Sequence, residues 1–220
     1  MTELRTVLFD LDGTLADTAP DLAFALNALL AEHGRAPLPY DRLRPEASHG
    51  ARALLRVGFG VTAEDENYTT LRQRFLDLYE ANLCRETRLF AGVRELLSEL
   101  ADRQLSWGIV TNKPAFLTEP LVQALGLGAA ACVVSGDTTA KAKPHPAPLL
   151  HACTQCRATP AACVYVGDAA RDIEAGRLAG MRTLVATFGY LRPGDQPADW
   201  GADALVGNPG EILEWIDDHR

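Results

Sequence analysis

The sequence predicts an α/β fold, a doubly wound parallel sheet with a small α-helical cap inserted after the first strand. Three observations point to this class. An apolar run over residues 6–9 ends in an acidic turn. Residues 16–88 show helical periodicity, whereas residues 89–220 alternate between apolar strands and amphipathic helices, as parallel sheets covered on both faces do. We therefore expect a core formed by residues 1–15 and 89–220 and a cap domain formed by residues 16–88.

The cap is expected to be wholly helical. Its first helix is predicted over residues 22–34, because leucines and alanines recur at helical spacing and Gly34 ends the pattern. Thr18 and Asp21 precede this helix in the arrangement of a capping box. After a proline-rich break, a second periodic stretch contains Leu71, Phe75, Leu78, Tyr79 and Leu83.

The core is expected to add helices and strands in turn. Its predicted helices span residues 92–103, 114–125, 146–157, 171–179 and 209–219. Its predicted strands span residues 105–111, 131–136, 163–168, 182–189 and 203–207. A helix between successive strands is the usual connection that keeps those strands parallel.

The composition is that of a globular protein with a small ligand. Of 220 residues, 47% are hydrophobic and 23% are charged, which is enough to bury a full core. The formal net charge of −8 disfavours nucleic-acid binding, which needs a cationic surface. The first residues lack signal-peptide features, and no run approaches the roughly 18 apolar residues of a membrane span. We expect a cytoplasmic monomer or homodimer with no nucleic-acid or membrane partner.

The five cysteines predict reduced thiols, because an odd number fits a disulfide framework poorly. Cys153 and Cys156 have the spacing of a metal or redox motif, and His151 is near them in the sequence. No second Cys or His pair lies at zinc-site spacing, however, and the segment has helical periodicity. We interpret the two cysteines as buried or half-buried helix residues.

Polar residues follow four predicted strands at their carboxyl ends, where the ligand crevice of an open α/β sheet lies. Carboxylates gathered without Cys or His ligands suit Mg²⁺, and the neighbouring hydroxyl, amide and ammonium groups suit a phosphoryl group. An aspartate at the strand end can act as a nucleophile while the second aspartate transfers protons. The residues are Asp10 and Asp12, Thr111, Asn112 and Lys113, Lys141 and Lys143, and Asp168 with Asp172.

Four segments carry a family resemblance: "FDLDGTLADT", "VTNK", "KAKPHPAP" and "VGDAARDIEAGRLAG". In order and position they resemble the four motifs of the haloacid dehalogenase superfamily. The resemblance implies that Asp10 is the nucleophile of a phosphatase and that Asp12 is its acid/base catalyst. It implies that Lys143 steadies the nucleophile and the phosphate, whereas Lys141 is interpreted as a solvated loop residue.

The resemblance also implies the remaining ligands. Thr111 and Asn112 would bind phosphate. Mg²⁺ would be held by Asp10, the backbone carbonyl of Asp12 and Asp168, with Asp172 supporting it directly or through water.

The cap is similar to that of the subfamily that includes phosphoglycolate phosphatase. The segments "SHGARAL" and "FGYLRPGDQPADWGADALV" look closest to bacterial members, some of which are N-acetylmuramic acid 6-phosphate phosphatases of cell-wall peptidoglycan recycling. The substrate is then a small phosphate ester with a carboxylate, either that sugar acid or 2-phosphoglycolate. The small residues Gly50, Ala51 and Ala53 leave space in the cap and favour the sugar acid.

Three cap residues are candidate substrate contacts: His49, Gly50 and Arg52. The guanidinium of Arg52 matches a planar carboxylate, although Arg52 could instead pair with a neighbouring acid. His49 is interpreted as orienting a loop rather than acting in catalysis.

Three rival functions are open to test. A phosphomutase would use the same aspartate pair. A dehalogenase would lack the acid/base residue, so Asp12 argues against it. A receiver-like signalling domain would also gather acids, Thr and Lys at strand ends, but the inserted residues 16–88 argue against an uncapped single domain.

Overall fold

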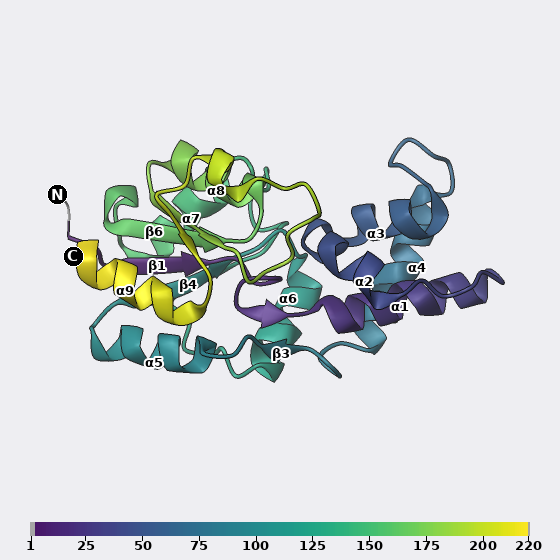
Figure 1. The fold of residues 1–220 in the computed structure, drawn as a ribbon, viewed down its shortest axis with the longest axis horizontal. Helices are drawn as coiled ribbons and strands as arrows, with labels where there is room; N and C mark the ends of the chain where they lie inside the picture. The colour runs from purple at the N-terminus through teal and green to yellow at the C-terminus, as the bar shows by residue number, and fades with distance from the viewer. Residues whose placement is uncertain (1–2, 220) are drawn as a thin grey trace.

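The computed structural model describes residues 3–219 and places a parallel sheet at one end of the molecule and helices α1–α4 at the other (Figure 1). The six strands have the order β5-β4-β1-β6-β7-β8, and every neighbouring pair is parallel. Strand order reverses on either side of β1, so a ligand crevice is expected at its carboxyl end. The strands are β1 (Thr6–Phe9), β4 (Ser106–Val110), β5 (Val133–Val134), β6 (Cys163–Gly167), β7 (Arg182–Ala186) and β8 (Ala204–Val206).

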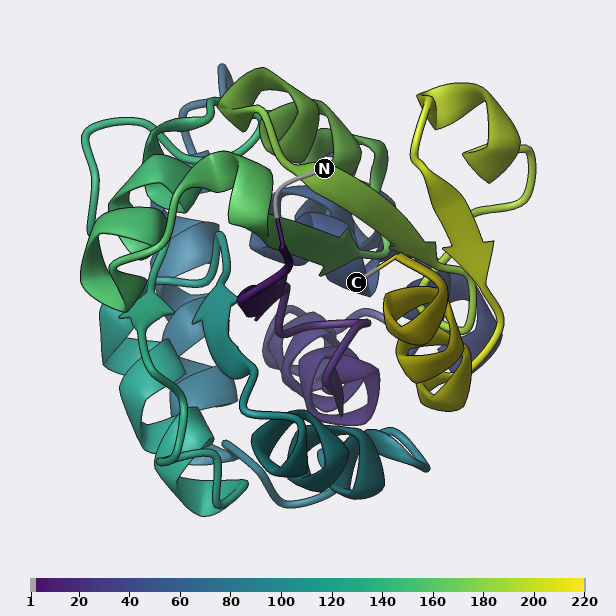
Figure 2. The ribbon, with the colours of Figure 1, turned by 90° about the vertical axis from the view of Figure 1, so that its left-hand side faces the viewer.

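Helices cover both faces of the sheet (Figure 2). Val7 and Phe9 face one apolar cluster, whereas Leu8 faces the other, as the two-residue period of a strand requires. The first cluster includes α5 (Val93–Asp102), α6 (Ala115–Ala124) and α9 (Pro209–His219), and the second includes α7 (Ala147–Cys156) and α8 (Ala170–Ala179). The predicted doubly wound α/β fold is confirmed.

The inserted helices share an apolar cluster of their own, which Leu117 and Tyr190 of the core join. Among residues 3–219, no helix combines the length and the apolar character needed to cross a bilayer. The inserted elements are α1 (Ala19–Glu32), α2 (Tyr40–Leu43), a 3₁₀ helix (Arg44–His49), α3 (Gly50–Phe59) and α4 (Tyr68–Ala81).

The junction between sheet and insert differs from the prediction. The inserted segment is not wholly helical, because β2 (Ala16–Asp17) pairs antiparallel with β3 (Arg88–Leu89) where the chain leaves and re-enters the core. The predicted capping box is also wrong. Thr18 donates its side-chain hydrogen bond to Asp12, and the buried Asp21 accepts hydrogen bonds from Thr87. Tertiary contacts therefore replace local capping at this helix.

The cysteines are all free thiols. Cys153 is buried and Cys156 is half-buried on α7, as interpreted from the sequence. The two do not contact each other: Cys153 Sγ lies 3.7 Å from Cys163 Sγ, and Cys156 Sγ lies 3.4 Å from Cys132 Sγ.

Candidate active site

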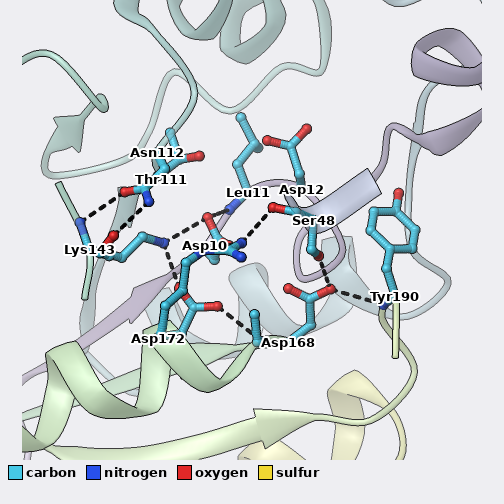
Figure 3. A network of polar contacts seen from close by, with 12 residues as sticks. Asp10, Leu11, Asp12, Ser48, Thr111, Asn112, Lys143, Asp168, Asp172 and Tyr190 are labelled. Atoms are coloured by element: carbon cyan, nitrogen blue, oxygen red, sulfur yellow. Dashed lines mark hydrogen bonds and ion pairs between the residues drawn. The ribbon is translucent and has the colours of Figure 1, made fainter. Parts of the chain in front are cut away.

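Two of the predicted carboxylates contact a buried lysine at the carboxyl end of β1, and a third carboxylate, that of Asp168, lies near them (Figure 3). Asp10 follows β1 directly, and its Oδ1 lies 3.0 Å from Lys143 Nζ. The same ammonium lies 2.8 Å from Asp172 Oδ1, and the side chains of Lys143 and Asp172 have no solvent exposure. Burial raises the pKa of Asp10, and the charge of Lys143 opposes that rise. Lys143 therefore keeps two buried carboxylates side by side.

The position of Lys143 is fixed from several sides. Its Nζ donates to Val110 O at 2.8 Å and lies 2.6 Å from the hydroxyl of Tyr165. The side-chain amide of Asn112 bonds both to the carbonyl and to the N–H of Lys143, at 2.9 and 3.0 Å. Asn112 thus uses its side chain to position the lysine. Lys141 is exposed, as interpreted from the sequence.

Lys143→Met is expected to destabilise the fold by about 3 kcal/mol, because removing one partner leaves buried carboxylates without compensation. The loss should shrink as the pH is lowered, since burial raises the pKa of Asp10 and, without the ammonium of Lys143 to oppose it, favours the uncharged carboxyl. Urea unfolding at pH 8 and pH 5 measures both effects. The matched control is Lys141→Met, which removes an exposed lysine two residues away. Equal stabilities of the two variants would contradict the assigned role of Lys143.

The acidic cluster has the chemistry of a site for a hard cation. Oxygens of Asp10, Asp168 and Asp172 lie within 4.8 Å of one another. Asp168 Oδ2 accepts hydrogen bonds from Ser48 Oγ and, at 2.9 Å, from Tyr190 N. Its Oδ1 is buried and has no hydrogen-bond partner among residues 3–219. An orphaned carboxylate oxygen beside further carboxylates fits Mg²⁺, which prefers oxygen ligands.

Asp172 differs from the other two acids. Its Oδ1 contacts Lys143, and its Oδ2 accepts a hydrogen bond from Ala169 N at 3.1 Å. Although burial opposes its charge, Lys143 and Arg171 lower the pKa of Asp172 below its usual value. Both oxygens of Asp172 therefore have partners within the protein, whereas Asp168 Oδ1 has none among residues 3–219.

Mg²⁺ is expected to stabilise the protein more at pH 8 than at pH 6. Burial, together with Asp10 and Asp172, raises the pKa of Asp168 from 3.8 to about 7. The folded protein without metal therefore loses stability as the pH rises from about 4 to about 7, and a bound cation offsets that loss. Below pH 7 the metal must displace a proton, so its affinity should fall about tenfold per pH unit.

Thermal unfolding with and without Mg²⁺ at the two pH values provides the measurement. Asp168→Asn should abolish the metal-dependent rise in Tm. A rise that is larger at pH 6, or one that persists in Asp168→Asn, would show that the cation binds elsewhere.

Asp12 faces a different set of partners. Its Oδ1 accepts a hydrogen bond from Thr18 and lies 3.0 Å from Lys113 Nζ. Lys113 also contacts the hydroxyl of Tyr79 on α4, at 3.1 Å. Burial disfavours the charge of Lys113, but Asp12 and Tyr79 together raise its pKa. One lysine therefore links the predicted acid/base residue of the core to a tyrosine of the inserted helices.

Gly13, the residue after Asp12, has φ +84°, and a Cβ at this position would collide with the Asp168 carboxylate.

A cavity of about 400 Å³ lies between the strand ends and the inserted helices. Asp10, Asp12 and Thr111 line its core side. From the other side it is lined by His49, Gly50 and Arg52, the three predicted cap residues, as well as by Arg72 and Tyr68. Burial and the nearby charge of Arg171 lower the pKa of His49 from 6.5 to about 4, so this imidazole is uncharged at neutral pH.

Sequence reasoning missed several residues of the site. Arg171 places Nη2 3.9 Å from Asp10 Oδ2 and donates to Ser48 O at 2.6 Å. Its place between Asp168 and Asp172 in the fourth motif is a signal that could have drawn attention to it. Lys113 was predicted to lie at the strand ends, but no role was assigned to it. Nothing local marked Arg72, because it lies in an ordinary amphipathic helix.

Comparisons with known proteins identify the relatives of this chain. A family model described as haloacid dehalogenase-like hydrolase matches residues 7–186. An N-acetylmuramic acid 6-phosphate phosphatase of Pseudomonas aeruginosa is 42% identical, over 97% of this chain and 95% of its own. A phosphoglycolate phosphatase of Xylella fastidiosa is 45% identical, over 93% of this chain and 90% of its own.

The structure also resembles solved structures. The crystal structure of a predicted phosphoglycolate phosphatase from Haemophilus somnus superposes with a TM-score of 0.85 at 27% identity, covering 98% of this chain and 99% of the other. A putative β-phosphoglucomutase from Thermotoga maritima has a TM-score of 0.78 at 23% identity, covering 99% and 100%, and shows that the fold is shared.

Proposed function

Because this chain belongs to the haloacid dehalogenase-like hydrolase family, we propose that it is a Mg²⁺-dependent phosphatase that acts through an aspartyl-phosphate at Asp10. The observation that carries the proposal is the floor of the cavity. There, Asp10 lies beside a buried lysine and two further carboxylates, a set of charges that fits a divalent cation together with a phosphoryl group. In this proposal residues 1–15 and 89–220 supply the catalytic groups, and residues 16–88 supply the cap.

The reaction has two steps in which this chain's own residues act. Asp10 attacks the phosphorus of the ester while Asp12 donates a proton to the leaving oxygen. Asp12 then takes a proton from water, which attacks the phosphorus and releases phosphate from Asp10. Thr111, the N–H of Asn112 and Lys143 hold the phosphoryl oxygens through both steps. Asp10, the carbonyl of Asp12 and Asp168 would bind Mg²⁺, which supplies charge to offset that of the phosphoryl group, and Asp172 supports them.

For the substrate we propose N-acetylmuramic acid 6-phosphate. A cavity of about 400 Å³ is of the size that encloses a substituted sugar, whereas a glycolate ester would leave much of it empty. Relatives named for this substrate match nearly the whole chain. The second candidate is 2-phosphoglycolate, because other relatives of similar identity are named for it. A role in peptidoglycan recycling follows from the first substrate. The cytoplasmic location and the monomeric or homodimeric state stay predictions.

A panel of phosphate esters tests this proposal. The purified protein with Mg²⁺ should hydrolyse N-acetylmuramic acid 6-phosphate with a kcat/KM at least tenfold above that for 2-phosphoglycolate. The reverse order would favour the second candidate. Retention of the phosphoryl group, with a hexose phosphate isomer as product, would indicate a phosphomutase. Failure to hydrolyse any ester, including p-nitrophenyl phosphate, would overturn the phosphatase assignment.

A further inference from the structure

Helix α4 presents one face to the cavity over its whole length. The residues of α4 that line the cavity recur at spacings of three and four, as one face of a helix does. They are Tyr68, Arg72, Phe75, Leu76 and Tyr79. The side chains that α4 offers to a bound molecule therefore form a single row that runs along the cavity.

One end of this row, at Tyr79, lies next to the proposed catalytic groups. Tyr79 contacts Lys113, and Lys113 pairs with Asp12, so Tyr79 marks the place where the leaving oxygen of the ester would lie. Arg72 precedes Tyr79 by seven residues. At 1.5 Å per residue, its backbone stands roughly 10 Å from Tyr79 along the helix axis. Arg72 is therefore remote from the phosphoryl group but inside the same cavity.

Arg72 is a half-buried cation without a partner. Within residues 3–219, no hydrogen bond or ion pair to it is found, and its neighbours in the row include the apolar Phe75 and Leu76. Arg52 also lines the cavity, but it is exposed on α3 and its charge acts on Glu64. The pKa of Glu64 is lowered first by its hydrogen bond with Thr62 and further by Arg52. Of these two arginines, Arg72 is the half-buried one, and no ion pair to it is found within residues 3–219.

We infer that Arg72 is the specificity-determining residue of the cap, and that it binds a substrate carboxylate that lies far from the phosphoryl group. This inference rests on the proposed phosphatase function. A planar guanidinium pairs with a carboxylate through two parallel hydrogen bonds, and a single unpaired cation among apolar side chains matches a single negative charge. Arg52, which is exposed and also lines the cavity, would assist Arg72 in binding this carboxylate.

The position of Arg72 also separates the two candidate substrates. In 2-phosphoglycolate only three bonds join the phosphorus to the carboxylate carbon, a span shorter than the roughly 10 Å that separate the backbones of Arg72 and Tyr79 along α4. In N-acetylmuramic acid 6-phosphate the sugar ring and the lactyl ether intervene, and eight bonds separate the two groups. The longer molecule can place its phosphoryl group at Asp10 and its carboxylate at Arg72.

The test compares two substrates that differ only in the lactyl group, N-acetylmuramic acid 6-phosphate and N-acetylglucosamine 6-phosphate. Arg72→Gln should lower kcat/KM about thirtyfold for the first, mainly through KM, and less than threefold for the second. The matched control is Arg74→Gln, on the same helix. Arg74 pairs with Glu32 and is not part of the cavity lining, so kcat/KM should keep its wild-type value for both substrates.

Other outcomes overturn the inference without affecting the phosphatase proposal. Equal losses on both substrates would show that Arg72 supports the fold of the cap, and unchanged kinetics would show that it contacts neither substrate. A wild-type preference for glucose 1,6-bisphosphate that Arg72→Gln removes would show that the second anion is a phosphate. Should Arg72→Gln not fold, Arg72→Lys is the second variant, because it keeps the charge but cannot form two parallel hydrogen bonds. A several-fold loss of kcat/KM confined to the muramic acid ester is then expected.

Discussion

Asp10→Asn protein is expected to fold normally and to hydrolyse its best substrate on the order of 10⁴-fold more slowly than the wild type. The amide keeps the size of the side chain but cannot attack phosphorus. The fold should tolerate the change, because Lys143 retains Asp172 as a partner at 2.8 Å. Burial already raises the pKa of Asp10, so removing its charge relieves a cost rather than creating one.

Steady-state kinetics and thermal unfolding of the same preparation measure the hydrolysis rate and the stability of the variant. The control is Asp102→Asn, an exposed aspartate at the end of α5 that does not line the cavity, and it should leave kcat unchanged. Asp10→Asn protein that is active at the wild-type rate would show that Asp10 is not the nucleophile.

Asp12→Asn is expected to lower kcat about 10³-fold and to change KM little. The substituted amide can still accept hydrogen bonds from Thr18 and Lys113, so the local arrangement should persist. What it cannot do is deliver a proton to the leaving oxygen and then remove one from water.

The leaving group distinguishes these two proton transfers. p-Nitrophenolate leaves without protonation, so the variant should release p-nitrophenol in a burst equal to the enzyme concentration and then turn over slowly. Stopped-flow absorbance measures this burst. An effect confined to KM, with no burst, would mean that Asp12 only helps to bind the substrate.

The core and its strand-end residues could be predicted from the sequence because their signals are local. Each long apolar run is followed at once by its functional residue, as Asp10 follows β1 and Asp168 follows β6. The sheet rule then brings these residues together without any knowledge of the loops. Lys143 does not directly follow its strand, and its role came from the resemblance of "KAKPHPAP" to the third motif.

The remaining features depend on contacts between distant segments. Lys113 meets Tyr79 across 34 positions of sequence, and Arg171 meets Ser48 across 123, and no periodic pattern encodes either pair. The strands β2 and β3 have two residues each, which is too short for an alternation to be visible. Thr18 could have served as a helix cap, but the Asp12 carboxylate provides a stronger, charged acceptor for its hydroxyl.

The central claim is that hydrolysis passes through a phosphoryl group bonded to Asp10, and trapping that species tests it most directly. Asp12→Asn protein should form the intermediate from p-nitrophenyl phosphate, whose leaving group needs no proton, but should hydrolyse it slowly. The variant is mixed with this ester and Mg²⁺, quenched in acid and digested for mass spectrometry. We expect one added phosphoryl group on the peptide that contains Asp10. This group should be removable by hydroxylamine, as an acyl phosphate is, and absent from the Asp10→Asn, Asp12→Asn double variant. Release of product while that peptide stays unmodified, or a phosphoryl group on a different residue, would contradict it.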